Sequence, residues 1–110
     1  MKRKGTKRGK VITLTTKHAR TKQDLGNGFT RLEFLNLPIP ARGFRTFRFS
    51  GMERNVIPIS GGWFITNDTT QDAWVTANYP QTSRTWIITM LNPTKVNRTT
   101  QFFVIVKNPS

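Results

Sequence analysis

The clearest strand signal in the chain is the stretch RTWIITML, which runs from Arg84 to Leu91. Trp86, Ile88 and Met90 share one face of this stretch, and threonine, isoleucine and leucine side chains occupy the other. Alternation of apolar, β-branched and aromatic residues with a period of two is typical of a β-strand.

A second strand is predicted from Thr99 to Lys107. Phe102, Val104 and Val106 face one way in it, while the residues between them face the other. A short polar loop, residues 92–98, separates it from the first strand. We therefore predict that the two strands pair as an antiparallel hairpin that ends the chain.

Shorter strand candidates precede this pair, and turn signals rich in Gly, Asn and Pro separate them. Pro58 places its strand at a sheet edge, and the poor alternation of residues 29–37 suggests a bulge. No stretch shows helical spacing. We predict an all-β fold, a single β-sandwich of jelly-roll-like or immunoglobulin-like type, with about eight short antiparallel strands. The other candidates are residues 10–16, 29–37, 43–50, 55–59, 63–66 and 73–77, and the turns are 26–28, 61–62, 67–72 and 78–83.

Positive charge is concentrated at the start of the chain. The first 22 residues carry nine Lys and Arg and no acid, whereas the other 88 carry nine Lys and Arg and all five acids. We predict an extended basic arm, residues 1–22, followed by the sandwich domain, residues 23–110. The nine cations are Lys2, Arg3, Lys4, Lys7, Arg8, Lys10, Lys17, Arg20 and Lys22.

A basic arm of this kind favours binding to a polyanion, because Lys and Arg neutralise phosphates. An acidic protein surface or plain solvent are the alternative environments for the arm. A second basic group, Arg42, Arg45 and Arg48, alternates with phenylalanines and predicts secondary contacts. Those phenylalanines could stack on bases, although alternating Phe residues are also what a sandwich core requires.

The chain offers little for catalysis. It has no cysteine, His18 is its one histidine, and its carboxylates are scattered apart from Asp68 and Asp72 in a polar turn. General acid–base and metal-assisted reactions need such groups close together. We expect a protein that is not an enzyme and that uses no metal or cofactor. No apolar run is long enough for a membrane span or a conventional secretion signal.

Aromatic residues suggest another kind of site. Trp63 and Trp74, together with Tyr79, could form a platform for a carbohydrate ligand. Trp residues, Trp86 included, are more often core or interface anchors.

The basic arm, the β-rich body and the last two strands together resemble small virion structural proteins. In the stretch from Thr82 to Pro93 a Trp-x-Ile strand leads into an Asn-Pro loop, and Thr99 to Val106 adds a Thr-rich aromatic strand. This pattern is similar to closing hairpins of β-sandwich capsid, minor capsid and decoration proteins of viruses and bacteriophages. The resemblance implies assembly in many copies within a virion formed in the host cytoplasm, with other subunits as partners.

We therefore expect a virion structural protein of the capsid, minor capsid, decoration or penton-like kind. Its arm would tether it to genomic nucleic acid or to neighbouring subunits. A cellular nucleic-acid-binding β module, such as a ribosome-associated protein, is the alternative. A carbohydrate-binding or adhesion β-sandwich is a third hypothesis, and the arm argues against it.

Overall fold

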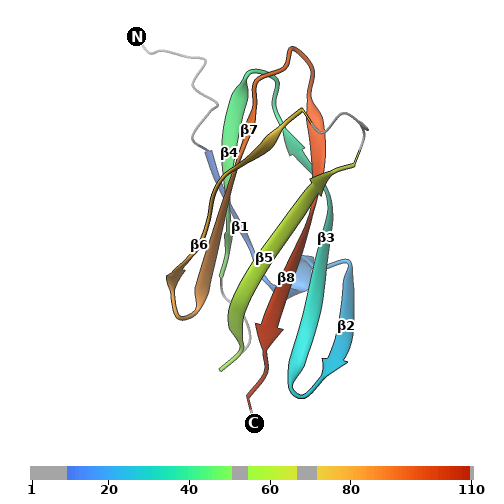
Figure 1. Cartoon of the computed structure of the whole chain (residues 1–110), viewed down its shortest axis with the longest axis vertical. Coiled ribbons are helices and arrows are strands. Elements are labelled where there is room, and N and C mark those ends of the chain that lie inside the picture. Colours follow the sequence, from blue (N-terminus) through green and yellow to red (C-terminus); the bar gives the residue numbers. More distant parts are fainter. Residues whose placement is uncertain (1–9, 51–54, 67–71, 110) are drawn as a thin grey trace.

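The computed structural model describes residues 10–50, 55–66 and 72–109. These residues form eight strands and one turn of 3-10 helix (Figure 1). The described helical turn is far too short to cross a membrane. The elements are β1 (Lys10–Leu14), η1 (Thr16–His18), β2 (Thr21–Gly26), β3 (Phe29–Ile39), β4 (Gly43–Phe49), β5 (Ile57–Ile65), β6 (Trp74–Thr82), β7 (Thr85–Asn92) and β8 (Arg98–Lys107).

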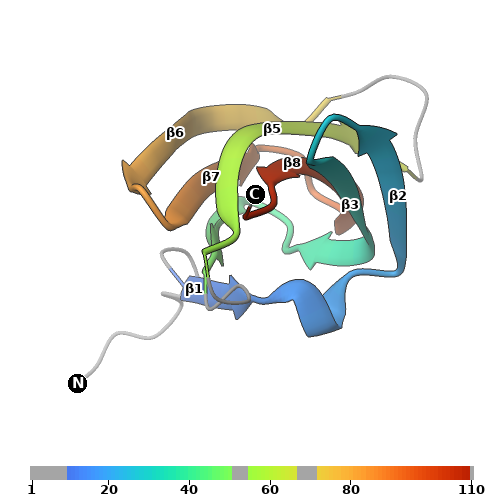
Figure 2. The same ribbon diagram turned by 90° about the horizontal axis from the view of Figure 1, so that it is seen from below.

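The strands form two four-stranded sheets that face each other. Sheet A has the order β1-β4-β7-β6, and sheet B has the order β2-β3-β8-β5. Seen from below, the sheets curve around the core, and β5 and β6 approach each other along one side (Figure 2). The all-β sandwich is thus confirmed. Its strand pairs are antiparallel, except that β1 runs parallel to β4.

Four phenylalanines fill the centre of the core. Phe34 and Phe102 come from sheet B, Phe47 and Phe49 come from sheet A, and all four are almost fully buried. Their ring centroids lie 4.7–5.4 Å apart in tilted and edge-to-face pairs. Such pairs contribute about 0.5–1.5 kcal/mol each beyond the burial of their area. The alternating residues of β4 and β8 therefore hold the two sheets together.

The predicted C-terminal hairpin is wrong. β8 lies between β3 and β5 in sheet B, whereas β7 lies between β4 and β6 in sheet A. Both strands exist as predicted, and their apolar faces do point into the core. Each of these two strands is central in its own sheet and pairs with a strand on both sides. The connection of residues 93–97 therefore crosses from one sheet to the other instead of forming a hairpin turn.

Two further predictions in the middle of the chain are wrong. Gly61-Gly62 is not a turn, because residues 57–65 form one strand with a bulge between Pro58 and Ser60. Residues 78–83 were predicted as a loop, but most of them continue β6. The edge position predicted from Pro58 is confirmed, since β5 ends sheet B. A bulge in β3, between Phe34 and Leu37, is also confirmed, and that strand continues through Pro38.

The predicted arm is too long. β1, η1 and the start of β2 all lie within residues 10–22, and they belong to the sandwich. Leu14 is buried in the core, and Ile12 packs against it. β2 gives no strand signal in the sequence, because its six residues are all exposed and show no alternation. The sandwich therefore includes the chain from Lys10 onward. Residues 1–9 and most of the predicted turn at 67–72 lie outside the described residues.

Candidate polyanion-binding end

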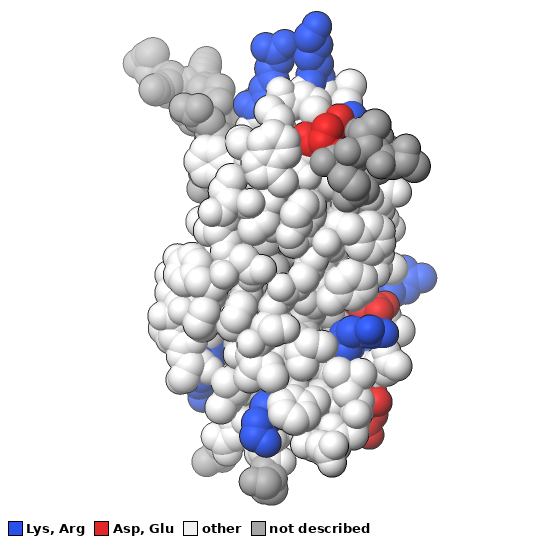
Figure 3. Space-filling model, viewed as in Figure 1, with Lys and Arg blue, Asp and Glu red and all other residues white. Residues whose placement is uncertain are grey.

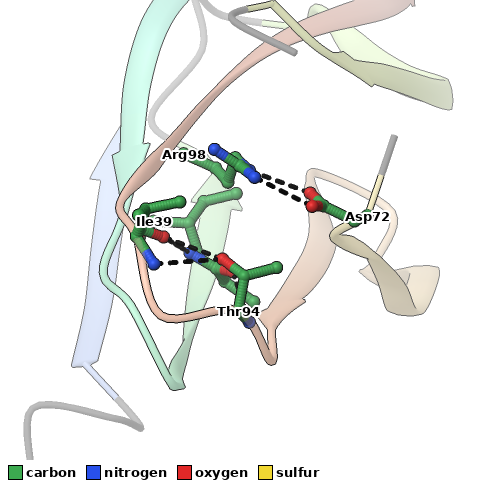
Figure 4. A network of polar contacts seen from close by, with 6 residues as sticks. Ile39, Asp72, Thr94 and Arg98 are labelled. Carbon is green, nitrogen blue, oxygen red and sulfur yellow. Dashed lines mark hydrogen bonds and ion pairs between the residues drawn. The ribbon is translucent and has the colours of Figure 1, made fainter. Parts of the chain in front are cut away.

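Two loops meet at one end of the sandwich, and a buried asparagine joins them. Asn92 is fully buried at the end of β7. Its Nδ2 donates to the carbonyl oxygens of Ile39 at 3.0 Å and Val96 at 2.9 Å. Its Oδ1 accepts from the backbone nitrogen and the hydroxyl of Thr94, at 3.0 and 2.7 Å (Figure 4). A buried amide with all these partners fixes the course of both loops.

Backbone contacts complete this connection. The backbone nitrogen of Arg42 donates to the carbonyl oxygen of Thr94 at 2.9 Å. The backbone nitrogen of Ala41 donates to Oδ1 of Asn97, also at 2.9 Å. Arg42 has a positive φ of 54°, which is uncommon for a residue with a side chain. The loops therefore form one ordered surface from which Arg42 and Lys95 project into solvent.

The first strand begins at the same end. Lys10 lies opposite Arg45 in the parallel pair of β1 and β4. Arg45 is three residues beyond Arg42, or about 10 Å along an extended strand. Lys10 is also exposed, and the five cations of residues 2–8 precede it in the sequence. We call Lys10, Arg42 and Lys95 the basic end.

Nearby negative charge is already engaged. Both Asp72 oxygens accept from Arg98, each at 2.8 Å, in a two-point ion pair (Figure 4). Among the described residues no carboxylate forms an ion pair with the three cations of the basic end. Figure 3 shows Lys and Arg side chains projecting at this end, shown at the top, beside an acidic side chain. The basic end is therefore available to an anionic ligand.

The remaining predicted basic residues do not form one surface. Lys17, Arg20 and Lys22 are exposed on η1, the β1–β2 connection and β2, away from the loops of the basic end. His18 accepts a hydrogen bond from the backbone nitrogen of Thr15 at 2.9 Å in a capping box. Lys2, Arg3, Lys4, Lys7 and Arg8 lie outside the described residues.

The second basic group separates across β4. Arg45 is half-buried, and its Nη1 donates to the carbonyl oxygen of Pro38 at 2.8 Å. Arg48 points outward and is exposed. Phe47 and Phe49 are core residues, whereas Phe44 lies on the outer face. The core interpretation is therefore confirmed for Phe47 and Phe49, and base stacking stays a prediction for Phe44. Arg42 is the arginine of this group that belongs to the basic end.

The tryptophans are also distributed. Trp63 lies on β5 and packs partly against the core. Trp86 on β7 donates from its indole nitrogen to Oδ1 of Asn78 at 2.6 Å. Trp74 and Tyr79 both lie exposed on β6. The predicted platform of Trp63, Trp74 and Tyr79 is therefore split between the two sheets.

Other candidate sites are few in the described part of the chain. No group of three or more His, Asp or Glu side chains lies close enough there to hold a metal ion. A cavity of about 280 Å³ opens beside β2. Leu32, Val56 and Val106 form its apolar lining, and Lys22 and Asp24 contribute charge to it.

Comparison with known proteins gives one match. The family model YjdH matches residues 10–106, which include every strand from β1 to nearly the end of β8. The chain belongs to the YjdH family. No curated protein and no solved structure matches the chain. The match begins at Lys10, the residue at which the sandwich itself starts.

Proposed function

We propose that this YjdH-family protein is a structural component of a nucleic-acid-containing assembly, in the first instance a virion. It binds polyanion through the basic end and the preceding arm, and it packs against other subunits through uncharged surface. The exposed, unpaired basic end, from which the arm extends, is the observation that carries this proposal. Phosphates are the ligands that such a cluster of Lys and Arg favours.

The uncharged surface lies along β5. Figure 3 shows the view of Figure 1, and its middle is free of Lys, Arg, Asp and Glu. Ile57, Ile59 and Phe64 on β5 are each about 40% exposed (39, 42 and 39%). Large apolar side chains gathered on one surface are typical of protein–protein contacts. This surface is our candidate for packing against neighbouring subunits.

A ribosome-associated module would also bind a polyanion, but that function does not account for the uncharged surface. A module embedded in RNA needs cations over a broad face, whereas on the face shown in Figure 3 the described cations lie at the margins. The carbohydrate hypothesis keeps some support, because Trp74 and Tyr79 are both exposed on β6.

The test compares cations at the two ends of the sandwich. We expect that Lys10→Gln, Arg42→Asn and Lys95→Gln, combined in one full-length protein, weaken binding of a fluorescent 12-residue oligothymidylate at least tenfold at low salt. Asn tolerates the positive φ of Arg42. Arg84→Gln is the control, because Arg84 is an exposed cation in the β6–β7 turn at the opposite end.

The proposal also makes a claim about assembly. We expect light scattering to detect particles of many copies when the protein is mixed with longer nucleic acid, and Ile59→Asp to prevent this while oligothymidylate still binds. A protein that binds no oligonucleotide at low salt contradicts the proposal. Equal losses from the three-cation variant and from Arg84→Gln contradict the role of the basic end.

A further inference from the structure

A bulge in β6 places two exposed aromatic rings on the same face of sheet A. Trp74 pairs with Leu91, and Tyr79 pairs with Ile87. Residues five apart in a regular strand would point to opposite faces. The register shift between Val75 and Ala77 adds one residue and restores both rings to the outer face. Each ring is 44% exposed.

The spacing suits separate ligand groups. Leu91 and Ile87, the partners of the two rings, are four residues apart on β7, or about 13–14 Å. Phe44 lies opposite Leu91 on the next strand, so Trp74, Leu91 and Phe44 form a row across the sheet. Arg48 lies opposite Ile87 and completes the equivalent row with Tyr79. We call the surface of Trp74, Tyr79, Phe44 and Arg48 the aromatic face.

Charge distinguishes this face from the other sheet. The four strands of sheet A contain Lys10, Arg45 and Arg48 but no Asp or Glu. Phe44 follows Arg42 by two residues, so the row of Trp74 also adjoins the basic end. Of these cations, Arg48 lies on the outer face with the two rings. Exposed rings on the same face as a cation, on strands without acids, match the surfaces on which single-stranded nucleic acids stack and neutralise their phosphates.

The outer face of sheet B carries aromatic side chains too, but they are occupied. Phe64 stacks on Phe103 with ring centroids 5.7 Å apart. Arg31 lies 6.0 Å from the Phe103 ring, and its Nε is 3.6 Å from Glu33. This face also carries the carboxylate of Glu33 beside those rings, which would repel phosphates.

From these contrasts we propose that single-stranded nucleic acid binds across the aromatic face. Bases stack on Trp74 and Tyr79, Arg48 in the row of Tyr79 contacts a phosphate beside that ring, and the strand continues to the basic end. This inference rests on the proposed function and specifies its polyanion. An arm and a basic end alone would hold any polyanion, whereas stacking requires bases that are free of a duplex.

The experiment measures the affinity of full-length variants for the same oligothymidylate and for a duplex of equal length. Base–aromatic stacking contributes about 1–3 kcal/mol per base, so Trp74→Ala and Tyr79→Ala should each weaken single-strand binding about 5- to 150-fold. Tyr79→Phe keeps the ring and should bind within about twofold of the unaltered protein. Phe29→Ala, which removes a half-buried ring from the outer face of sheet B, should do the same. Circular dichroism verifies that each variant is folded.

Three results would overturn the inference. One is unchanged single-strand affinity in both alanine variants while salt-sensitive binding persists, which leaves the proposed polyanion function intact. Another is equal or tighter binding to the duplex. The third is Trp74-dependent binding of maltohexaose with no effect of Trp74 on oligothymidylate, which assigns the face to neutral glycans. Absence of any oligonucleotide binding would instead contradict the proposed function itself.

Discussion

At Gly61 the backbone of β5 lies against side chains of sheet A. A Cβ atom there would lie 2.8 Å from the indole nitrogen of Trp86 and 2.9 Å from Cδ1 of Ile88. Its carbonyl oxygen accepts from Nδ2 of Asn78 at 3.1 Å, so the same backbone also joins β5 to β6. The glycine is needed because side chains of sheet A fill its space.

We predict that Gly61→Ala lowers the free energy of unfolding by about 1–3 kcal/mol, because the methyl group overpacks a rigid part of the core. Gly62→Ala is the matched control, since its Cβ would meet only the Phe103 ring at 3.9 Å, an ordinary contact. Urea denaturation of both variants measures the difference. Equal stability of the two variants would refute this account of the β5–β6 side.

At the scale of elements, the N-terminal segment joins the fold through a parallel strand. The carbonyl oxygen of Leu14 accepts from the backbone nitrogen of Ser50 at 3.0 Å, and the Leu14 side chain is buried. The backbone nitrogen of Arg20 donates to the carbonyl oxygen of Glu33 at 2.7 Å, which links the chain to sheet B. Residues 10–22 thus connect both sheets.

Two truncations separate arm from sandwich. Removal of residues 1–9 should leave the free energy of unfolding within about 0.5 kcal/mol, because every described strand, β1 included, is kept. Removal of residues 1–22 deletes β1 and η1. The lost burial of Leu14 alone costs about 1.5–3 kcal/mol of stability. We expect this shorter protein to lose cooperative thermal unfolding. A cooperative thermal transition at an unchanged midpoint would contradict this expectation and would support a sandwich domain that begins after residue 22.

A strand could be predicted from the sequence where one of its faces is buried. β4, β7 and β8 alternate because their inner residues fill the core. β2 and most of β6 are exposed and show no alternation, so local sequence marks them only as polar. The pairing of β8 with β3 and β5 depends on contacts far apart in sequence, which no pattern within the final hairpin candidate reveals.

The candidate site was predictable in part for the same reason. Lys10 and Arg42 stand in basic stretches, and both were identified from the sequence. Lys95 is an isolated lysine after Pro93, and only the hydrogen bonds of Asn92 place it beside Arg42. The aromatic face depends on a bulge, and the sequence from Trp74 to Tyr79 contains no glycine or other signal that reveals it.

On the scale of the whole molecule, charge and apolar surface are separated. Cations gather at the basic end, sheet A contains no acid, and the middle of the surface over β5 is uncharged. One protein can thus hold a nucleic-acid strand on one surface and a neighbouring subunit on another. The central claim is that the folded sandwich, and not the arm alone, contacts the nucleic acid.

Nuclear magnetic resonance tests this claim most directly. Full-length protein labelled with ¹⁵N is titrated with the 12-residue oligothymidylate, and shifts of each backbone amide and indole signal are followed. The account predicts the largest shifts at Arg42, Arg48, Tyr79 and Lys95 and at the indole of Trp74, with little change at Gln23, Glu33 and Phe103 of sheet B. Shifts confined to residues 1–9, or concentrated on sheet B, would contradict it.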